Sequence, residues 1–156
     1  MLLSIYQWLN TTRMSAFLQG SSYTFPVVEV IHLMGITILL GASIIVCLRF
    51  LGWGIKQPAS VIYEGLRTWT WIGFWVTVIT GFVMIVAEPI KLSSNLMFGY
   101  KIYGLALGFA LHLFGYLRYT KPGRAEASPI GAKIVAILLL MTWLVTGVGG
   151  RLIGFV

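Results

Sequence analysis

Residues 26–50 read PVVEVIHLMGITILLGASIIVCLRF, and this stretch decides the class of fold. A helix that crosses the hydrocarbon core of a bilayer needs about 20 mostly apolar residues. The stretch meets that requirement and carries a basic residue, Arg49, near its end. Glu29 and His32, however, lie inside its first third. The sequence therefore predicts a membrane-spanning helix that carries a carboxylate and an imidazole one turn apart.

The composition of the whole chain is that of a membrane protein. Of its 156 residues, 58% are hydrophobic and 10% are charged, whereas soluble domains average about 25% charged residues. The formal net charge is +7, and the basic residues flank apolar runs, as in cytoplasmic loops that meet anionic lipid. They form no patch of the kind that binds nucleic acid, so we expect no nucleic-acid partner. The single cysteine, Cys47, excludes a disulfide within the chain.

Four apolar runs predict one transmembrane domain over residues 23–156. They cover roughly residues 25–50, 68–87, 96–119 and 130–153. The segments between them, 52–60, 88–95 and 120–129, each contain proline and a basic residue, which is typical of loops. In the third run, the spacing of Gly104 and Gly108 predicts close contact with another helix. The expected fold is all-α, an integral membrane four-helix bundle.

The first 22 residues form a separate segment. Their apolar positions fall near helical spacing, whereas the polar run NTTR at residues 10–13 makes the segment too polar to span a bilayer. We therefore expect an N-terminal amphipathic helix over residues 1–19 that lies in the membrane interface. Gly20 and the two serines after it are expected to end this helix.

The distribution of basic residues predicts the orientation of the chain. With four spans, one side of the membrane receives seven basic residues: Arg49, Lys56, Arg67, Arg118, Lys121, Arg124 and Lys133. The other side receives four: Arg13, Lys91, Lys101 and Arg151. The richer side is expected to be cytoplasmic, so both termini are predicted to be outside. In a Gram-negative bacterium this means a multi-pass protein of the inner membrane with both termini in the periplasm.

Several stretches of the chain resemble a known family. They are FPVVEVIHLMGITILLGASIIVCLRFLG at residues 25–52, TWTWIGFWVTVITGFVM at 68–84, MFGYKIYG at 97–104 and GGRLIG at 149–154. Over roughly residues 15–156 the chain resembles a family of small bacterial four-helix membrane proteins that is catalogued only as a domain of unknown function. The resemblance implies the fold and no activity.

The resemblance also singles out individual positions. The residues that match the pattern of the family are Glu29, His32, Arg49, Lys101 and Arg151. In that family the third helix usually carries an Asn followed one turn later by a His. This chain has His112 and Tyr116 at those places.

The depth of each polar residue follows from a rise of about 1.5 Å per residue, with the centre of each apolar run taken as the midplane. His32 and Met84 then each lie about 9 Å towards the outside. Glu88 and Arg151 lie about 15–16 Å towards the outside, and Glu29 lies one turn beyond His32. The sequence thus predicts a polar layer in the outer part of the bundle, with Glu29 and His32 on one helix face.

Two interpretations of this layer stay open. Ionisable groups inside a span are costly and usually face the bundle or a cavity. As a structural network, Glu29 would pair with Arg151, Glu88 would pair with Lys91, and His32 would bond to a neighbour. As a functional site, His32 would be the ligand of a cofactor or metal, and Glu29 would orient a neighbouring group or pair with Arg151.

Haem b and copper are the cofactors that these residues suit. His32 and His112 are the only histidines, but His112 falls about 4–8 Å inside the midplane, which disfavours both as ligands of one haem. His112 could instead join a haem to a partner chain. His32 with Met84 is the better-matched pair for His–Met haem ligation, and the same pair could hold Cu(I). Binding no cofactor is the third alternative.

The function expected from these residues is that of a membrane subunit. The sequence shows no phosphate-binding loop, zinc-protease motif or nucleophile elbow, so we do not expect an enzyme on its own. We expect a small subunit of a bacterial redox system that supports haem- or quinone-linked electron transfer near the outer leaflet. Its expected partners are the bilayer and larger membrane or periplasmic proteins, or further copies of itself. The alternatives are a copper-binding or copper-transport protein and a structural assembly subunit without cofactor.

Overall fold

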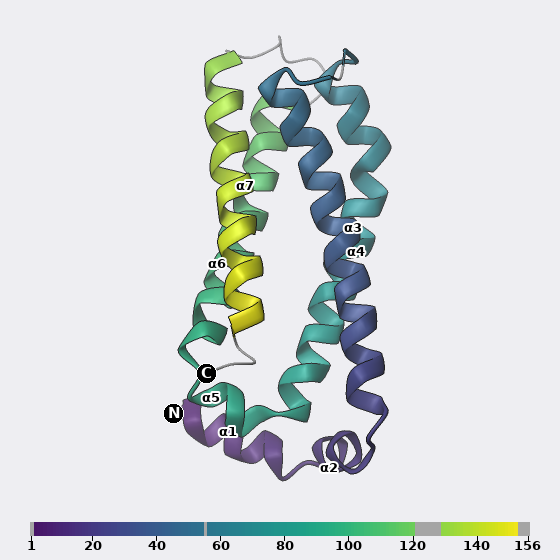
Figure 1. The fold of residues 1–156 in the computed structure, drawn as a ribbon, viewed down its shortest axis with the longest axis vertical. Coiled ribbons are helices and arrows are strands. Elements are labelled where there is room, and N and C mark those ends of the chain that lie inside the picture. Colours follow the sequence, from purple (N-terminus) through teal and green to yellow (C-terminus); the bar gives the residue numbers. More distant parts are fainter. Residues whose placement is uncertain (1, 55, 121–128, 153–156) are drawn as a thin grey trace. The chain divides into compact units, whose positions relative to one another are not determined.

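The computed structural model describes residues 2–54, 56–120 and 129–152, and the regular structure in these residues is helical. In chain order the elements are α1 (Leu2–Asn10), α2 (Arg13–Gly20), α3 (Thr24–Leu51), α4 (Ala59–Ala87), α5 (Pro89–Ser93), α6 (Leu96–Gly115), the π-helix η1 (Tyr116–Thr120) and α7 (Pro129–Leu152). The seven α-helices of the described residues are labelled in Figure 1. The basic loop residues Lys121 and Arg124 and the last residue of the fourth predicted run, Ile153, lie outside the described residues.

The helices confirm the all-α membrane fold that the sequence predicts. Among the described residues, four helical segments are long and apolar enough to cross a membrane: 24–51, 59–87, 96–120 and 130–151. The protein is therefore a multi-pass membrane protein.

The second span differs most from its predicted bounds, because α4 begins at Ala59 and not near residue 68. Its first turns carry the exposed charges Glu64 and Arg67 after the buried Ile62 and Tyr63, so these turns are amphipathic and escape a search for continuous apolar residues.

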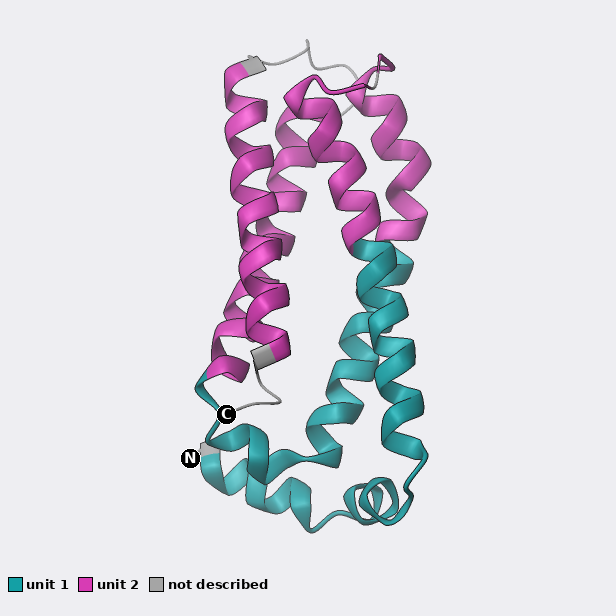
Figure 2. Cartoon of the chain, in the orientation of Figure 1, with its two compact units in different colours: residues 1–39, 71–96 teal, residues 40–70, 97–156 magenta. Residues whose placement is uncertain are grey.

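The chain divides into two compact units, which are coloured separately in Figure 2. Unit 1 consists of residues 1–39 and 71–96, and unit 2 of residues 40–70 and 97–156. Unit 1 therefore contains α1, α2, α5, the first half of α3 and the second half of α4. Unit 2 contains the remaining halves of α3 and α4 together with α6, η1 and α7. Each unit is described below by itself.

In unit 1, α3 and α4 approach closely at two glycines. A methyl group built on Gly73 would lie 2.7 Å from the backbone nitrogen of Leu39 and 2.9 Å from the carbonyl oxygen of Gly35. A methyl group on Gly35 would lie 2.8 Å from Val76 and 3.0 Å from the backbone nitrogen of Thr77. Because real Cβ atoms do not come this close to a neighbouring backbone, only glycine permits this contact between the two helices.

The N-terminal segment forms two short helices, where the sequence predicts a single helix over residues 1–19. The break falls at Thr11 and Thr12, whose hydroxyls donate to the carbonyl oxygens of Trp8 and Leu9. The Thr12 hydroxyl also accepts a hydrogen bond from the backbone nitrogen of Ser15 at 3.2 Å, so Thr12 caps the start of α2. A threonine side chain can form hydrogen bonds with the unpaired backbone groups at a helix end, and it is less favourable inside a helix. The second helix therefore starts at this position.

The two N-terminal helices are held to the end of α4 within unit 1. Leu18 is buried against Val86 and Ala87, and Leu9 and Phe25 pack on the same cluster. α1 packs against α5, and these elements gather at one end of the unit in Figure 2. Trp8 and Phe17 remain exposed on the outer faces of α1 and α2, as expected for helices that lie in an interface.

In unit 2, α6 packs on α7 through small residues. A methyl group on Gly104 would overlap the side chain of Thr146, and one on Gly108 would lie 3.2 Å from the indole ring of Trp143. The close helix contact predicted from Gly104 and Gly108 is therefore confirmed, with α7 as the partner. Cys47 is fully buried in the same unit and fills space as a small apolar side chain.

Candidate functional site

His32 is buried in unit 1, where its ring faces α4. The His32 Nδ1 atom lies 2.9 Å from the Thr80 hydroxyl oxygen. The ring lies against Gly81, where a methyl group would come within 3.2 Å of the imidazole Cε1 atom. The predicted hydrogen bond from His32 to a neighbour is therefore confirmed, with Thr80 as the partner.

The partner of Thr80 fixes the proton on the His32 ring. The Thr80 hydroxyl lies 2.5 Å from the carbonyl oxygen of Val76, one turn earlier in α4, and donates to it. A hydroxyl has one proton, so Thr80 must accept from His32. The neutral imidazole then carries its proton on Nδ1 and presents Nε2 as an acceptor. This is the arrangement found in histidine ligands, whose second nitrogen is oriented by a hydrogen-bond acceptor.

The face of α4 that is turned towards His32 carries further groups that suit a ligand site. Thr77, Thr80, Gly81 and Met84 follow each other at helical spacing and therefore share this face. The hydroxyl of Thr77 is buried and has no hydrogen-bond partner among the described residues. Met84, the predicted second ligand, is half-buried one turn beyond Thr80. His32 and Met84 thus belong to one unit and to facing helices.

The remaining charged members of the predicted polar layer come from both units. Glu29 is exposed on α3, one turn before His32, and belongs to unit 1. Arg151 is exposed near the end of α7 and belongs to unit 2. The pairing of Glu29 with Arg151 stays a prediction. The pairing of Glu88 with Lys91 is confirmed, because the Glu88 carboxylate lies 3.4 Å from the Lys91 ammonium.

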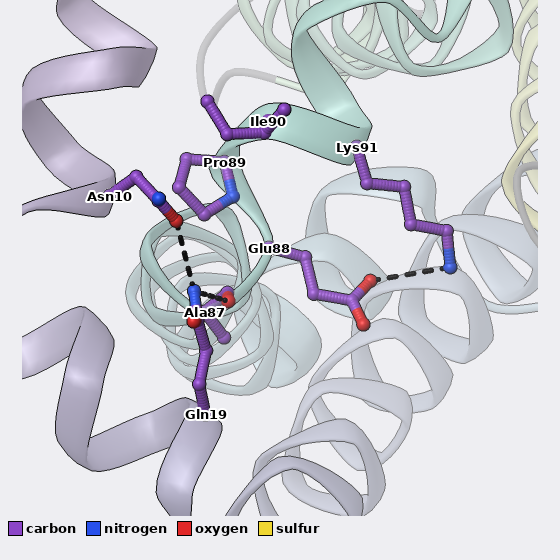
Figure 3. Close-up of a pocket in the computed structure, with 7 residues that line it drawn as sticks. All are labelled: Asn10, Gln19, Ala87, Glu88, Pro89, Ile90 and Lys91. Carbon is purple, nitrogen blue, oxygen red and sulfur yellow. Dashed lines mark hydrogen bonds and ion pairs between the residues drawn. The ribbon is translucent and has the colours of Figure 1, made fainter.

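The Glu88–Lys91 pair borders an open cleft of about 270 Å³ in unit 1. Figure 3 shows its lining residues, which come from α1, α2 and the junction of α4 with α5: Asn10, Gln19, Ala87, Glu88, Pro89, Ile90 and Lys91. The Gln19 amide nitrogen donates to the side chain of Asn10 at 3.1 Å and to the carbonyl oxygen of Ala87 at 3.0 Å. These bonds tie α2 to the end of α4, so the polar groups of this cleft act chiefly in holding the N-terminal helices.

His112 is buried in unit 2 beside a different hydroxyl. Its Nδ1 atom lies 3.2 Å from the Ser43 hydroxyl of α3. Its Nε2 atom is buried and has no hydrogen-bond partner among the described residues. The two histidines therefore belong to separate units, and each places its Nδ1 atom against a hydroxyl of a neighbouring helix.

An aromatic side chain, Tyr63, lies beside the ring of His112. The ring centroid of His112 lies 5.7 Å from that of Tyr63, which stacks on Tyr116 at 3.9 Å with an angle of 17° between the rings. The Tyr116 hydroxyl lies 3.4 Å from the Glu64 carboxylate, which forms an ion pair with Arg67 at the surface. Tyr116, which stands where the resembled family has histidine, is thus a packing partner in the neighbourhood of His112.

Sequence reasoning did not identify Ser43, Thr80 or Trp143. Serine and threonine inside an apolar helix most often bond to their own backbone, so their position alone carries little information. Trp143 did offer a signal. Tryptophan prefers the ends of transmembrane helices, but Trp143 lies near the middle of the fourth span and is buried. Among the described residues, no three His, Cys, Asp or Glu side chains gather into a group that could hold a metal ion.

The helices and the two buried histidines define the class of protein: a small all-α multi-pass membrane protein whose interior contains polar groups. A family model matches residues 5–156. The chain belongs to this family, DUF6644, which is described as a family of unknown function. No curated protein and no solved structure matches the chain.

Proposed function

We propose that the protein is a small subunit of a bacterial redox system in the inner membrane, with both termini in the periplasm, and that it holds haem b through His32. The observation that carries the proposal is the hydrogen-bond chain from His32 through Thr80 to Val76. This chain places the imidazole proton on Nδ1, so Nε2 is the basic nitrogen of the ring. Haem iron is bound by neutral histidine in this form.

The residues around His32 have defined tasks in this proposal. Thr80 orients the ring and keeps its tautomer, and Gly81 provides the flat surface against which the ring lies. Met84, one turn further along α4, is the candidate second ligand. A bound haem would supply one-electron transfer, and the apolar helices around it would limit access of water.

Copper is the alternative occupant, because imidazole and thioether also suit Cu(I). The two alternatives give different signals in one preparation. Haem produces an intense Soret absorption band, and copper appears in elemental analysis without such a band. Purified protein with neither would favour a structural assembly subunit and would contradict the proposal.

The test is the absorption spectrum and metal content of the purified protein and of two matched variants. His32→Gln keeps a polar side chain of similar length but removes the ligand nitrogen, so the Soret band should disappear. His112→Gln is the control, because it changes the other buried histidine and should leave the band in place. A His32→Gln protein with its full haem content would show that His32 is structural.

A further inference from the structure

Two buried nitrogen atoms in unit 2 lack hydrogen-bond partners among the described residues: Nε2 of His112 and Nε1 of Trp143. The residues are 5% and 7% exposed, so water does not reach these atoms from the surface. Leaving one such group unsatisfied costs about 1–3 kcal/mol. Two in one compact unit are therefore a reason to expect a ligand that supplies the missing partner.

Gly108 and His112 connect the two side chains, because they share one face of α6. The indole ring of Trp143 packs on Gly108, and His112 follows Gly108 by four residues, which is about one helical turn. Trp143 comes from α7, where the buried Ala136 and Leu139 precede it on the same face. The Tyr63 ring also lies beside His112, with the two ring centroids 5.7 Å apart.

The Trp143 nitrogen is a donor in every state, because indole carries a fixed N–H group. The role of the His112 nitrogen follows from Ser43. Five threonines inside the spanning helices donate their hydroxyl proton to the carbonyl oxygen four residues earlier: Thr37, Thr70, Thr80, Thr142 and Thr146. Ser43 makes no such bond in the described structure, and its one hydrogen-bond partner there is His112 Nδ1.

A count of protons decides the tautomer of His112. If Ser43 donates to Nδ1, the proton of the neutral ring lies on Nε2, and one buried group stays unsatisfied. If Nδ1 donates to Ser43, both the Ser43 proton and the Nε2 lone pair stay unsatisfied. Because each unsatisfied group is costly, the first arrangement is favoured. His112 therefore presents an N–H group, the opposite of His32, and unit 2 contains two buried donors without acceptors.

We propose that these two donors bind a quinone through its carbonyl oxygens. A quinone head is a flat, uncharged ring whose carbonyl groups are hydrogen-bond acceptors, which matches two N–H groups among aromatic and small apolar side chains. Haem iron does not match, because it needs the lone pair of Nε2. An anion such as phosphate would need a cationic side chain at this depth. The quinone site deepens the proposed function, because it names the substrate class of the redox subunit. It rests on that function only for the source of the electrons that would reduce the quinone.

The experiment measures binding of a short-chain ubiquinone and a short-chain menaquinone to the full chain in detergent micelles. In wild-type protein labelled with ¹⁵N-tryptophan, the indole N–H resonance of Trp143 should shift saturably with added quinone. Trp143→Phe keeps an aromatic ring but removes the donor, so Kd should rise about tenfold, the factor that corresponds to about 1.4 kcal/mol. Trp75→Phe is the control, because Trp75 is exposed on α4 and belongs to unit 1.

Two results would overturn the quinone site. One is an unshifted Trp143 resonance in wild-type protein at saturating quinone, which would indicate that a buried water molecule alone serves the two donors. The other is equal affinity in Trp143→Phe and Trp75→Phe. The haem content is recorded in the same samples. Quinone binding without haem would contradict the proposed function alone, and a His32-dependent haem without quinone binding would contradict the quinone site alone.

Discussion

His32 and Thr80 are joined by a hydrogen bond whose direction is fixed, because the Thr80 proton already goes to the carbonyl oxygen of Val76. The corresponding bond between His112 and Ser43 runs the other way by the count of buried donors and acceptors. The two histidines lie in similarly apolar surroundings, but the neighbouring hydroxyl puts the proton on Nδ1 of His32 and on Nε2 of His112.

Replacing Thr80 should destabilise the protein through His32. Thr80→Val keeps the shape of the side chain but leaves the His32 N–H group without its acceptor, and we expect a loss of about 1 kcal/mol in the free energy of unfolding. Thr80→Ser keeps the hydroxyl and should lose less. Unfolding in mixed micelles measures both variants. Equal losses would show that the methyl group of Thr80, and not its hydroxyl, matters.

Adding a methyl group at the contact of α3 and α4 should separate the helices. Gly73→Ala places its Cβ against the backbone of Leu39, which cannot turn away, and overpacking of this kind costs about 1–3 kcal/mol. Gly65→Ala is the control on the same helix, since nothing lies within 4 Å of the added methyl group. It should be neutral or stabilising by up to about 1 kcal/mol, because alanine favours helices. If the two variants unfold alike, the close approach in unit 1 is wrong.

Removing the Gln19 amide should loosen the N-terminal helices. Gln19→Ala loses the bonds to Asn10 and to the Ala87 carbonyl, so backbone amides of α2 should exchange their hydrogens faster. Gln7→Ala, on the exposed face of α1, should leave exchange unchanged. The measurement is hydrogen–deuterium exchange with mass spectrometry in micelles. An α2 that exchanges no faster in Gln19→Ala would place its attachment in the Leu18 cluster instead.

The orientation of the chain can be tested with fused reporters. The seven-to-four distribution of basic residues predicts that alkaline phosphatase fused after residue 156 is active, since this enzyme needs the periplasm. A fusion after Gln57, in the first loop, should be inactive, whereas a fluorescent protein at the same place should be bright. The reverse pattern of reporter activity would show that both termini are cytoplasmic, and it would place His32 near the inner leaflet.

The fold was predictable because its main signal is hydrophobicity sustained over long stretches of sequence. Apolar length identified the four spans, and Gly104 with Gly108 indicated a close helix contact. The first turns of α4 and the break at Thr11–Thr12 were not predicted, since both depend on which face of a short segment becomes buried. The helix α5 arises where Pro89 occupies the first turn, a position that tolerates proline, although the sequence suggests only a loop.

The candidate site was predictable only in part. His32 was identified because an ionisable residue inside a span is rare. Thr80 and Ser43 were not, because their role comes from a partner on another helix and not from their own surroundings in the sequence. Depth along a helix also says nothing about the direction in which a side chain points. For this reason Glu29, one turn before His32 in the same helix, lies exposed while His32 is buried.

The packing of α6 has a consequence for how sequences of this family diverge. Its fully buried residues are Gly108, His112 and Gly115, and no large apolar side chain of this helix is fully buried. Most other positions of α6 face outward, where any apolar residue serves equally well in contact with lipid. Amino-acid substitutions should therefore accumulate rapidly over most of this helix and slowly at the buried positions on its one packed face. On that face, exchange of His112 should occur together with change at Ser43 or Trp143, so that related chains vary these three positions as a set.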